Sequence, residues 1–287
     1  MGDLPTVDIG ELRKAIGRET SASDTVTPQL CMALLATLDK TAPLLREGDE
    51  APLSVHWCLA QPTVPMHGIG SDGHPARGGF LPAVPLPRRM WAGGALRFLA
   101  PIHVGESVTR LSRIEDVTLK EGRTGPLCFV TVSHSLSAPG GTVIEERQDI
   151  VYRGAEPAAP PPAQAAAKPE PPPRAAETSR EVMADPVLLF RYSALTFNAH
   201  RIHYDRAYAT GEEGYEGLVV HGPLQATLLM TLAAELRGMP KTFDFRGVRP
   251  LFDGARFTVN AAPTETGLDL WTADAAGRAT MTARATW

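Results

Sequence analysis

A proline- and alanine-rich run in the middle of the chain constrains its fold more than any other feature. Residues 154–174 consist almost entirely of Ala, Pro, Glu, Gln and Lys, and they show no apolar periodicity. Such a run cannot bury a core and is typical of an extended, semi-rigid linker. We therefore predict an N-terminal domain over residues 1–153, a linker over 154–184 and a C-terminal domain over 185–287.

The N-terminal part of the chain predicts a helix followed by a series of strands. Residues 24–29 form a good helix start, with a capping side chain ahead of a proline, and leucines keep helical spacing as far as Lys40. A further helix is expected over 3–18, and a long ordered loop, rich in Gly and Pro, over 61–87. Strands are expected at 53–60, 95–99, 108–119, 127–136 and 142–152.

The C-terminal part repeats this pattern in altered form. An apolar helix is expected from Gly222 to Leu236, ended by Gly238. Both parts also contain an Arg-Phe strand entry near a proline and a glycine turn, which supports two like halves packed as a pseudo-dimer. Each half is then a sheet wrapped around a helix. Strands are expected at 187–193, 243–250, 255–261, 268–272 and 280–287.

Composition narrows the classes of partner. The net charge of -4 gives no case for binding nucleic acid or an acidic membrane surface. No stretch approaches 18 uninterrupted apolar residues, and no signal peptide is visible at the N-terminus. Cys31, Cys58 and Cys128 are far apart and lie in apolar strings, which predicts buried, reduced thiols in a cytoplasmic protein.

Polar residues suited to chemistry are concentrated between Phe190 and Gly222. The sequence there predicts a strand, a polar turn, a short helix and then the buried start of the longer helix. Three of the chain's eight histidines fall inside this stretch, namely His200, His203 and His221. Because apolar segments on both sides should hold these side chains in place, the stretch is the first candidate for a functional site.

The middle of this stretch resembles the signature of the MaoC-like, R-specific enoyl-CoA hydratases, Ser/Thr-Gly-Asp-x-Asn-Pro-Ile/Leu-His-x-Asp. The matching segment is Tyr192-Ser-Ala-Leu-Thr-Phe-Asn-Ala-His-Arg-Ile-His-Tyr-Asp205. The family's histidine corresponds to His203. The following Leu218-Val-Val-His-Gly-Pro-Leu-Gln225 is similar to the start of the family's central helix, whose glycine amide faces the thioester carbonyl. Gly222 holds the position of that glycine.

Three of the chain's departures from the signature concern its aspartate, asparagine and proline. Asn198 stands in place of the catalytic aspartate, His200 in place of the asparagine and Arg201 in place of the proline. This variant is similar to one branch of the family, which comprises the type 2 hydroxyacyl-thioester dehydratases and the mesaconyl-C4-CoA or itaconyl-CoA hydratases. The segment from Met90-Trp-Ala-Gly-Gly94 through Gly105-Glu106 also resembles that branch.

The resemblance implies an α+β double hot-dog fold, in which two antiparallel sheets each wrap around a central helix. It implies a hydro-lyase that adds water to, or removes it from, a short enoyl-CoA or hydroxyacyl-CoA thioester. Mesaconyl-C4-CoA or itaconyl-CoA is the first choice of substrate, CoA is part of that substrate, and no further cofactor is expected. The C-terminal half would be catalytic and the N-terminal half would shape the pocket. A homodimer is an option for the assembly.

Hydration of a double bond conjugated to a thioester needs a base, an acid and donors to the carbonyl oxygen. His203 suits proton transfer because an imidazole titrates near neutral pH. Asn198 cannot be a base but can orient the attacking water, so His203 carries both proton transfers or shares them with His200. The amide of Gly222, ahead of Pro223 at a helix start, would stabilise the thioester oxygen by about 3 kcal/mol.

Further candidates for substrate contacts lie around these residues. Arg201, or an arginine of the first half, could pair with a free carboxylate of the substrate. Arg88 and Arg89 could instead meet the nucleotide phosphates of CoA. The substrate-binding candidates within the main stretch are His200, Arg201, His221 and Thr196.

Structural roles are the alternatives for the same side chains. His203 and His221 could be structural histidines, and Asn198 could simply cap the short helix. His200 and His203 have the i, i+3 spacing of a metal pair, yet no Cys or carboxylate completes a recognisable set, so we predict no metal. The glycine-rich loop from His67 to His74 lacks the Lys-Ser/Thr of a P-loop and is expected to be a lid or a wall of the CoA tunnel.

Two other functions are compatible with the sequence. One is a 3-hydroxyacyl-thioester dehydratase of fatty-acid synthesis, for which an apolar pocket without a buried arginine is expected. The other is a hot-dog protein that binds acyl-CoA without turnover, which the replacement of the usual aspartate by Asn198 supports.

Overall fold

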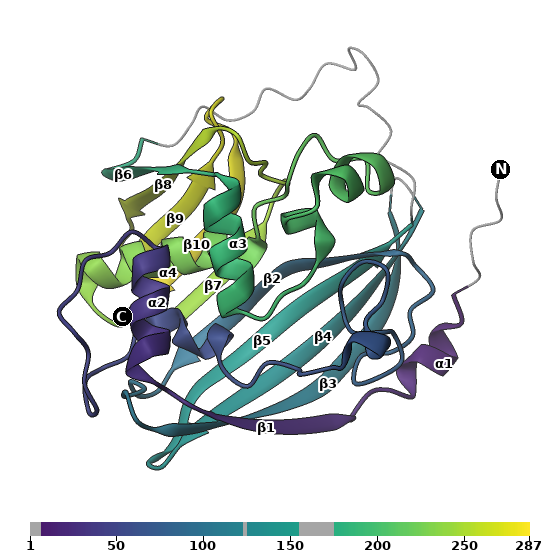
Figure 1. Cartoon of the computed structure of the whole chain (residues 1–287), viewed down its shortest axis with the longest axis horizontal. Coiled ribbons are helices and arrows are strands. Elements are labelled where there is room, and N and C mark those ends of the chain that lie inside the picture. The colour runs from purple at the N-terminus through teal and green to yellow at the C-terminus, as the bar shows by residue number, and fades with distance from the viewer. Residues whose placement is uncertain (1–6, 123–124, 155–174) are drawn as a thin grey trace.

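The structure is a computed structural model that describes residues 7–122, 125–154 and 175–287. These residues form a ten-stranded antiparallel sheet with the order β1-β3-β4-β5-β2-β7-β10-β9-β8-β6 (Figure 1). The strands are β1 (Glu19–Thr25), β2 (Arg88–Phe98), β3 (Ser107–Gly122), β4 (Gly125–Ala138), β5 (Gly141–Arg153), β6 (Thr178–Met183), β7 (Thr242–Gly247), β8 (Arg256–Pro263), β9 (Gly267–Ala273) and β10 (Ala279–Thr286).

The two halves of the sheet have the same topology. From the edge inward, each half runs through its first, third, fourth, fifth and second strand, and the two second strands, β2 and β7, pair at the centre. In that pairing Gly94 lies opposite Phe245, and Leu96 lies opposite Phe243. The predicted double hot-dog fold, with two like halves in one chain, is therefore confirmed.

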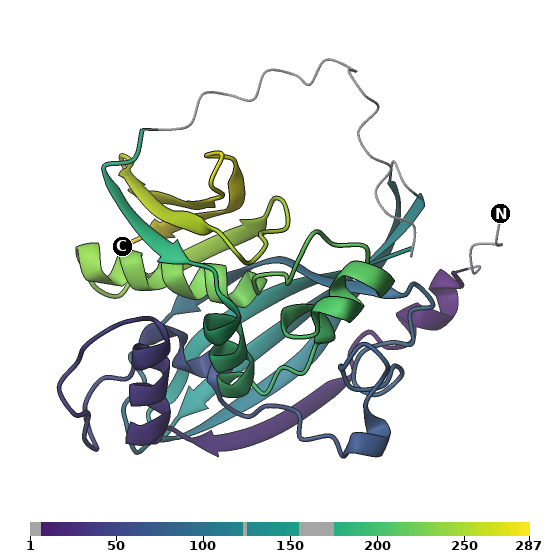
Figure 2. The same cartoon turned by 45° about the horizontal axis from the view of Figure 1, so that its top comes forward.

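Three of the four α-helices of the described chain lie together beside the curved sheet, and α1 lies apart from them, against β3. Figures 1 and 2 show α2, α3 and α4 as neighbours, and α4 packs against strands of both halves. The α-helices are α1 (Ile9–Arg13), α2 (Pro28–Thr37), α3 (Pro186–Leu195) and α4 (Gly222–Arg237), and the shorter helical turns are η1 (Leu53–Cys58), η2 (Met66–Gly68), η3 (Arg201–His203) and η4 (Tyr208–Glu212).

One apolar core joins the two halves. Leu34 of α2 and Leu96 of β2 belong to the same buried cluster as Leu229 of α4 and Phe243 of β7. A smaller cluster lies under α1 and the far end of the long strands β3, β4 and β5. Because the main cluster draws on both halves, each half needs the other to bury most of its apolar side chains.

Several expectations for the elements are confirmed. The helix start near residue 27 is that of α2, where the Thr27 hydroxyl accepts a hydrogen bond from the Leu30 amide at 3.1 Å. α4 ends at Gly238, whose φ of 77° is the left-handed conformation that glycine adopts without strain. The predicted strands of residues 95–152 and 243–287 are present, with ends shifted by a few residues. The three cysteines are buried and free.

Two predicted strands are wrong. Residues 53–60 form the helical turn η1 instead, and residues 187–193 belong to α3. Both are short apolar runs, and a short run that is buried on several sides does not show by its periodicity whether it is helix or strand. The sequence did carry a helix signal for the second segment, because Asp185 precedes Pro186 and its carboxylate accepts a hydrogen bond from the Leu188 amide at 2.8 Å.

Two strands at the edges of the sheet were missed. β1 exposes all seven of its residues, so it has no apolar alternation to reveal it, and pairing with β3 makes it a strand. β6 lies within the predicted linker over 154–184, yet it pairs with β8 and is part of the second half. Residues 155–174, the most proline-rich part of that linker, lie outside the described residues. The predicted helix over 3–18 is confirmed only for α1.

None of the helices in the described parts of the chain is long and apolar enough to cross a membrane.

We expect Leu229→Ala to lower the free energy of unfolding by about 2–5 kcal/mol, because Leu229 is fully buried in the shared core and its truncation leaves a cavity. Urea denaturation followed by circular dichroism measures the change. Leu236→Ala on the same helix is the matched control, since Leu236 is 41% exposed. Equal effects of the two substitutions would contradict a core centred on α4.

Candidate active site

The turn between α3 and η3 places the first group of the site. Phe197 has a φ of 47°, a left-handed conformation that is unusual for an aromatic residue and typical of strained functional segments. The chain changes direction at Asn198. The side-chain oxygen of Asn198 accepts a hydrogen bond from the His200 amide at 3.0 Å. This bond closes a turn ahead of η3, whose N-cap is His200 and has no side-chain cap, so Asn198 does not have the helix-capping role given above as its structural alternative. Its NH2 group bonds to no described residue, and Asn198 lines the main cavity.

His203 has a defined tautomer. Its Nδ1 lies 2.7 Å from the carbonyl oxygen of Val219, and because a carbonyl can only accept, Nδ1 carries the proton. Nε2 therefore holds a free lone pair. This atom bonds to no described group and is not among the buried polar atoms without a partner, so it is accessible from the cavity that His203 lines.

Burial keeps His203 neutral. Removal from water lowers its pKa to about 4, and the hydrogen bond to Val219 offsets only part of that shift. At neutral pH the ring is thus an uncharged base with an open acceptor atom. A neutral imidazole of this kind can take a proton from water, provided that a developing negative charge nearby stabilises the imidazolium that results.

His221 lies behind His203 and outside the cavity. The two rings stack with centroids 3.6 Å apart, and His221 is fully buried. Its Nε2 bonds to the Ser193 hydroxyl at 2.8 Å, while burial holds its pKa well below the usual value. His221 was predicted to contact the substrate. In the structure it does not line the cavity and instead supports the ring of His203.

His200 forms the next wall of the cavity. Its ring meets that of His203 edge-on at 5.4 Å and lies 4.1 Å from that of His74. Burial lowers the pKa of His200, and the neighbouring histidines lower it further, so His200 is also neutral at pH 7. Thr196, which also lines the cavity, donates its hydroxyl proton to the Tyr192 carbonyl at 2.8 Å.

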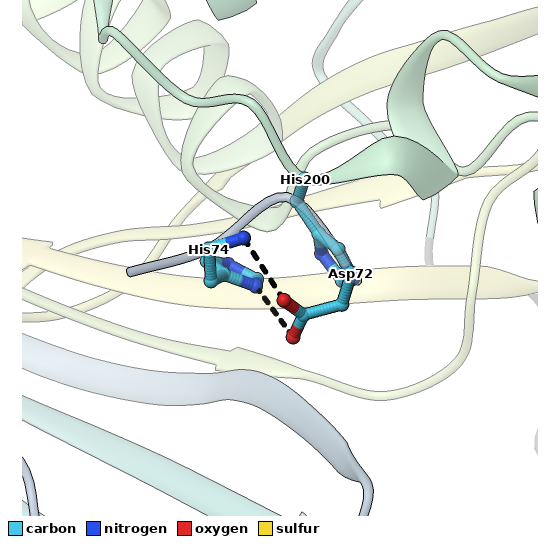
Figure 3. A group of neighbouring side chains, drawn as sticks. All are labelled: Asp72, His74 and His200. Carbon is cyan, nitrogen blue, oxygen red and sulfur yellow. Dashed lines mark hydrogen bonds and ion pairs between the residues drawn. The ribbon is translucent and has the colours of Figure 1, made fainter. Parts of the chain in front are cut away.

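A loop of the first half packs against this turn. Figure 3 shows Asp72 and His74 of that loop beside His200 of the second half. Asp72 accepts from the backbone amide of His74 at 2.9 Å and from its Nδ1 at 3.2 Å. The Asp72 carbonyl accepts from the Arg201 amide at 2.9 Å. The loop expected to be a lid or tunnel wall thus forms part of the cavity wall at His74.

The approach of the loop is tight at Gly73. Its φ is 89°, and a Cβ on this residue would lie 1.8 Å from the carbonyl oxygen of Ala199. Only glycine fits both the conformation and the space. The glycine-rich run is evident in the sequence, but only the fold shows that it packs against the turn at Ala199.

Asp72, His74 and His200 are the described group that could hold a metal ion, since one ligand atom of each lies within 4.8 Å of the others. Their bonding argues for another role. The Asp72 carboxylate already accepts two hydrogen bonds from His74, and these bonds hold its pKa well below the usual range although burial opposes this. Besides burial, the cations Arg89 and Arg77 lower the pKa of His74, and the same positive field would repel a metal ion. We interpret the group as a brace between the two halves.

Gly222 offers a free donor at the start of α4. Pro223 follows it, and no described carbonyl or side chain accepts from the Gly222 amide. A Cβ on Gly222 would lie 3.1 Å from the ring of Trp91 in β2, so glycine leaves the amide reachable from the cavity. The positive end of a 16-residue helix adds to this donor's preference for negative charge.

The main cavity has a volume of about 2420 Å³ and draws on both halves. It brings together most of the predicted site residues with residues of the first half. Arg201 lies elsewhere, in a second cavity of about 480 Å³, where it bonds to Asp205 at 2.8 Å and lies over the ring of Tyr208. The main cavity is lined by Asn198, His200, His203, Gly222 and Thr196 from the second half, and by His74, Arg89 and Trp91 from the first half.

The chain matches the family described as hydroxyacyl-thioester dehydratase type 2 over residues 54–253. It is 46% identical over 256 residues to the mesaconyl-C(4)-CoA hydratase of Chloroflexus aurantiacus, covering 89% of this chain and 90% of that protein. It is 27% identical over 224 residues to the mitochondrial hydroxyacyl-thioester dehydratase type 2 of Schizosaccharomyces pombe, covering 69% of this chain and 73% of that protein.

Solved structures confirm the fold. HtdX of Mycobacterium tuberculosis aligns with a TM-score of 0.65 at 21% identity, covering 93% of this chain and 99% of that one. A conserved hypothetical protein of the same organism, which has a double hotdog fold, aligns with a TM-score of 0.56 at 13% identity, covering 94% and 95%.

We expect Gly73→Ala to displace the loop from the turn at Ala199, because the added Cβ has no room there. Stability should fall by about 1–3 kcal/mol, and amide hydrogen exchange should rise at residues 70–76 and 198–203 together. Gly79→Ala in the same loop is the control, since a Cβ on Gly79 meets nothing within 4 Å. Unchanged exchange in Gly73→Ala would contradict the tight contact.

Proposed function

The chain belongs to the hydroxyacyl-thioester dehydratase type 2 family, and we propose that it is a hydro-lyase that reversibly adds water to the double bond of a short enoyl-CoA thioester. Mesaconyl-C4-CoA is the first candidate substrate, because the relative at 46% identity is named for that reaction. The observation that carries the proposal is the neutral His203, which lines the same cavity as the free amide of Gly222. CoA is part of the substrate, and the reaction needs no further cofactor.

The Gly222 amide acts on the thioester. Its N–H donates to the carbonyl oxygen, where negative charge grows as water adds to the β-carbon. One such donor in a preorganised site stabilises the transition state by about 3 kcal/mol. The donor is fixed by α4 before substrate arrives, so no reorganisation is needed during the reaction.

His203 carries the proton. Its Nε2 takes a proton from the attacking water while the water oxygen bonds to the β-carbon and the double-bond electrons move onto the thioester as an enolate. The imidazolium then returns this proton to the α-carbon, which regenerates the neutral ring. The enolate stabilises the imidazolium between these two steps, because opposite charges attract strongly in a cavity shielded from water.

Asn198 orients the water. Its side-chain oxygen is held by the His200 amide, so its NH2 group is the part left to donate to the water oxygen. An amide in the position of the family's usual aspartate can therefore align the nucleophile, although it removes no proton. This division leaves both proton transfers to His203.

A dehydratase acting on 3-hydroxyacyl thioesters of fatty-acid synthesis is the second candidate function. It is supported by the 27% identical relative, named hydroxyacyl-thioester dehydratase type 2. A panel of mesaconyl-C4-CoA, itaconyl-CoA, crotonyl-CoA and longer 3-hydroxyacyl-CoA esters, followed by absorbance of the conjugated thioester, separates the two. Preference for the long apolar esters would replace the first proposal, and binding of all esters without turnover would indicate a non-catalytic acyl-CoA protein.

His203→Ala should lower kcat by about 100-fold or more, because it removes the group that transfers the proton. Binding of a saturated, unreactive acyl-CoA should change little. His67→Ala controls for a general effect of removing a histidine, since His67 is exposed and outside the cavity lining. Near-wild-type turnover by His203→Ala would exclude the role.

The pH profile tests the protonation state of His203. Because the deprotonated ring is the active form and its pKa is lowered to about 4, kcat/KM should stay nearly flat between about pH 5.5 and 8 and fall only towards pH 4. A histidine with an ordinary pKa of about 6.5 would instead lose activity from about pH 7 downward. Circular dichroism at each pH separates titration from unfolding.

A further inference from the structure

Arg89 carries a charge that no described acid neutralises. It lies on β2, is half-buried and lines both cavities, yet no carboxylate of the described chain lies within ion-pair distance of it. Its neighbour Arg88 is buried with Glu213, 3.5 Å away, and Arg201 is bound to Asp205. Arg88 and Arg201 are thus each paired with an acid of this chain, whereas Arg89 has no such partner among the described residues.

The position of Arg89 on β2 sets it beside the acyl end of the cavity. Trp91, two residues along the strand, contacts Gly222, whose amide faces the thioester. Residues two apart on a strand lie on the same face at roughly 6.6 Å, a distance that an arginine side chain spans. Arg89 also contributes to the low pKa of His74 and of His200, so its charge lies near both histidines.

A ligand group that pairs with Arg89 must be an anion and must lie close to the reacting carbons. In mesaconyl-C4-CoA the free carboxylate is bonded to the β-carbon, the same atom that receives water. The phosphates of CoA, by contrast, are separated from the thioester by the whole pantetheine arm. A cation one strand step from the Trp91–Gly222 contact therefore fits the carboxylate better than the phosphates.

Other polar groups near Arg89 suit a carboxylate. The Tyr152 hydroxyl lies next to the guanidinium, and Arg89 and Tyr152 line both cavities. The nearby carboxylate of Asp72 is held by two hydrogen bonds from His74, which keeps it turned to the loop. Arg77 shares this wall, but its guanidinium is engaged by the carbonyls of Val84 and Pro87.

We propose that Arg89 binds the free carboxylate of the substrate and thereby selects dicarboxylic over monocarboxylic acyl-CoA thioesters. This inference rests on the proposed function, because it assumes that the thioester carbonyl meets the Gly222 amide. A guanidinium can hold both carboxylate oxygens at once. It would also keep the β-carbon in line with the water held near Asn198 and His203.

The test compares two unreactive ligands that differ only at this group. Succinyl-CoA carries a carboxylate on the β-carbon, and butyryl-CoA carries a methyl group there, while the CoA part is identical. Binding of each is measured by isothermal titration calorimetry to the full chain. Arg89→Met should weaken succinyl-CoA by about 30-fold or more, as expected for loss of one partner of a buried charge pair, and should change butyryl-CoA by less than about threefold.

Two further variants sharpen the result. Arg89→Lys should recover part of the succinyl-CoA affinity, because it keeps the charge without the paired donors. Arg97→Met on the same strand is the matched control, since Arg97 is exposed and pairs with Glu145 outside both cavities. It should leave both ligands unchanged.

Equal weakening of both ligands by Arg89→Met would show a contact to CoA or a disturbed fold and would overturn the proposal. Unchanged binding of both would overturn it as well. Because the ligands are not turned over, the result does not depend on activity. If the wild type hydrates mesaconyl-C4-CoA and the Arg89→Met variant shows the same substrate selectivity, only the role of Arg89 is refuted. If the wild type hydrates no ester, the proposed function is refuted.

Discussion

The pairing of β2 with β7 is the constraint on which the rest of the structure depends. It joins two five-stranded halves into one sheet and lets one core run through both. The loop over residues 61–87 leads directly into β2, so this pairing also carries that loop to the second half. Without the central pair, the turn at Asn198 and the loop at Asp72 would have no common frame, and the cavity between them would have only one wall.

Removal from water sets the protonation state of the histidines in the site. His200, His203 and His221 lie close together and away from water, and burial and mutual repulsion keep all three neutral. The acidic group near them, Asp72, is engaged by His74 and leaves His203 without a carboxylate partner. A base of this kind is weak at rest and becomes effective only when an opposite charge develops nearby, and in the proposed reaction the enolate beside Gly222 supplies that charge.

The two halves divide the work without being equivalent. The second half holds His203, the proposed proton carrier, and the helix amide, and the first half contributes the brace at Asp72 and His74, the ring of Trp91 and the cation at Arg89. Their meeting requires a close backbone approach, which Gly73 permits. Because the two halves are parts of one chain, the residues that line the cavity from the first half can differ without any change to His203 in the second half.

The sequence by itself determined the elements whose signals are local. The apolar spacing of α4 and the motif that contains Asn198, His203 and Gly222 could be read from residues close together in the chain, whereas the predicted linker wrongly included β6, which pairs with β8. Local pattern failed where a segment's partners decide its state: α3 was predicted to be a strand, and the exposed β1 gave no signal until it paired with β3. Only the tertiary structure placed His74 beside His200 and the charge of Arg89 near both histidines. The physical reason is that these contacts join segments far apart in the chain, and strand pairing and backbone hydrogen bonds fix them without any periodicity in the sequence.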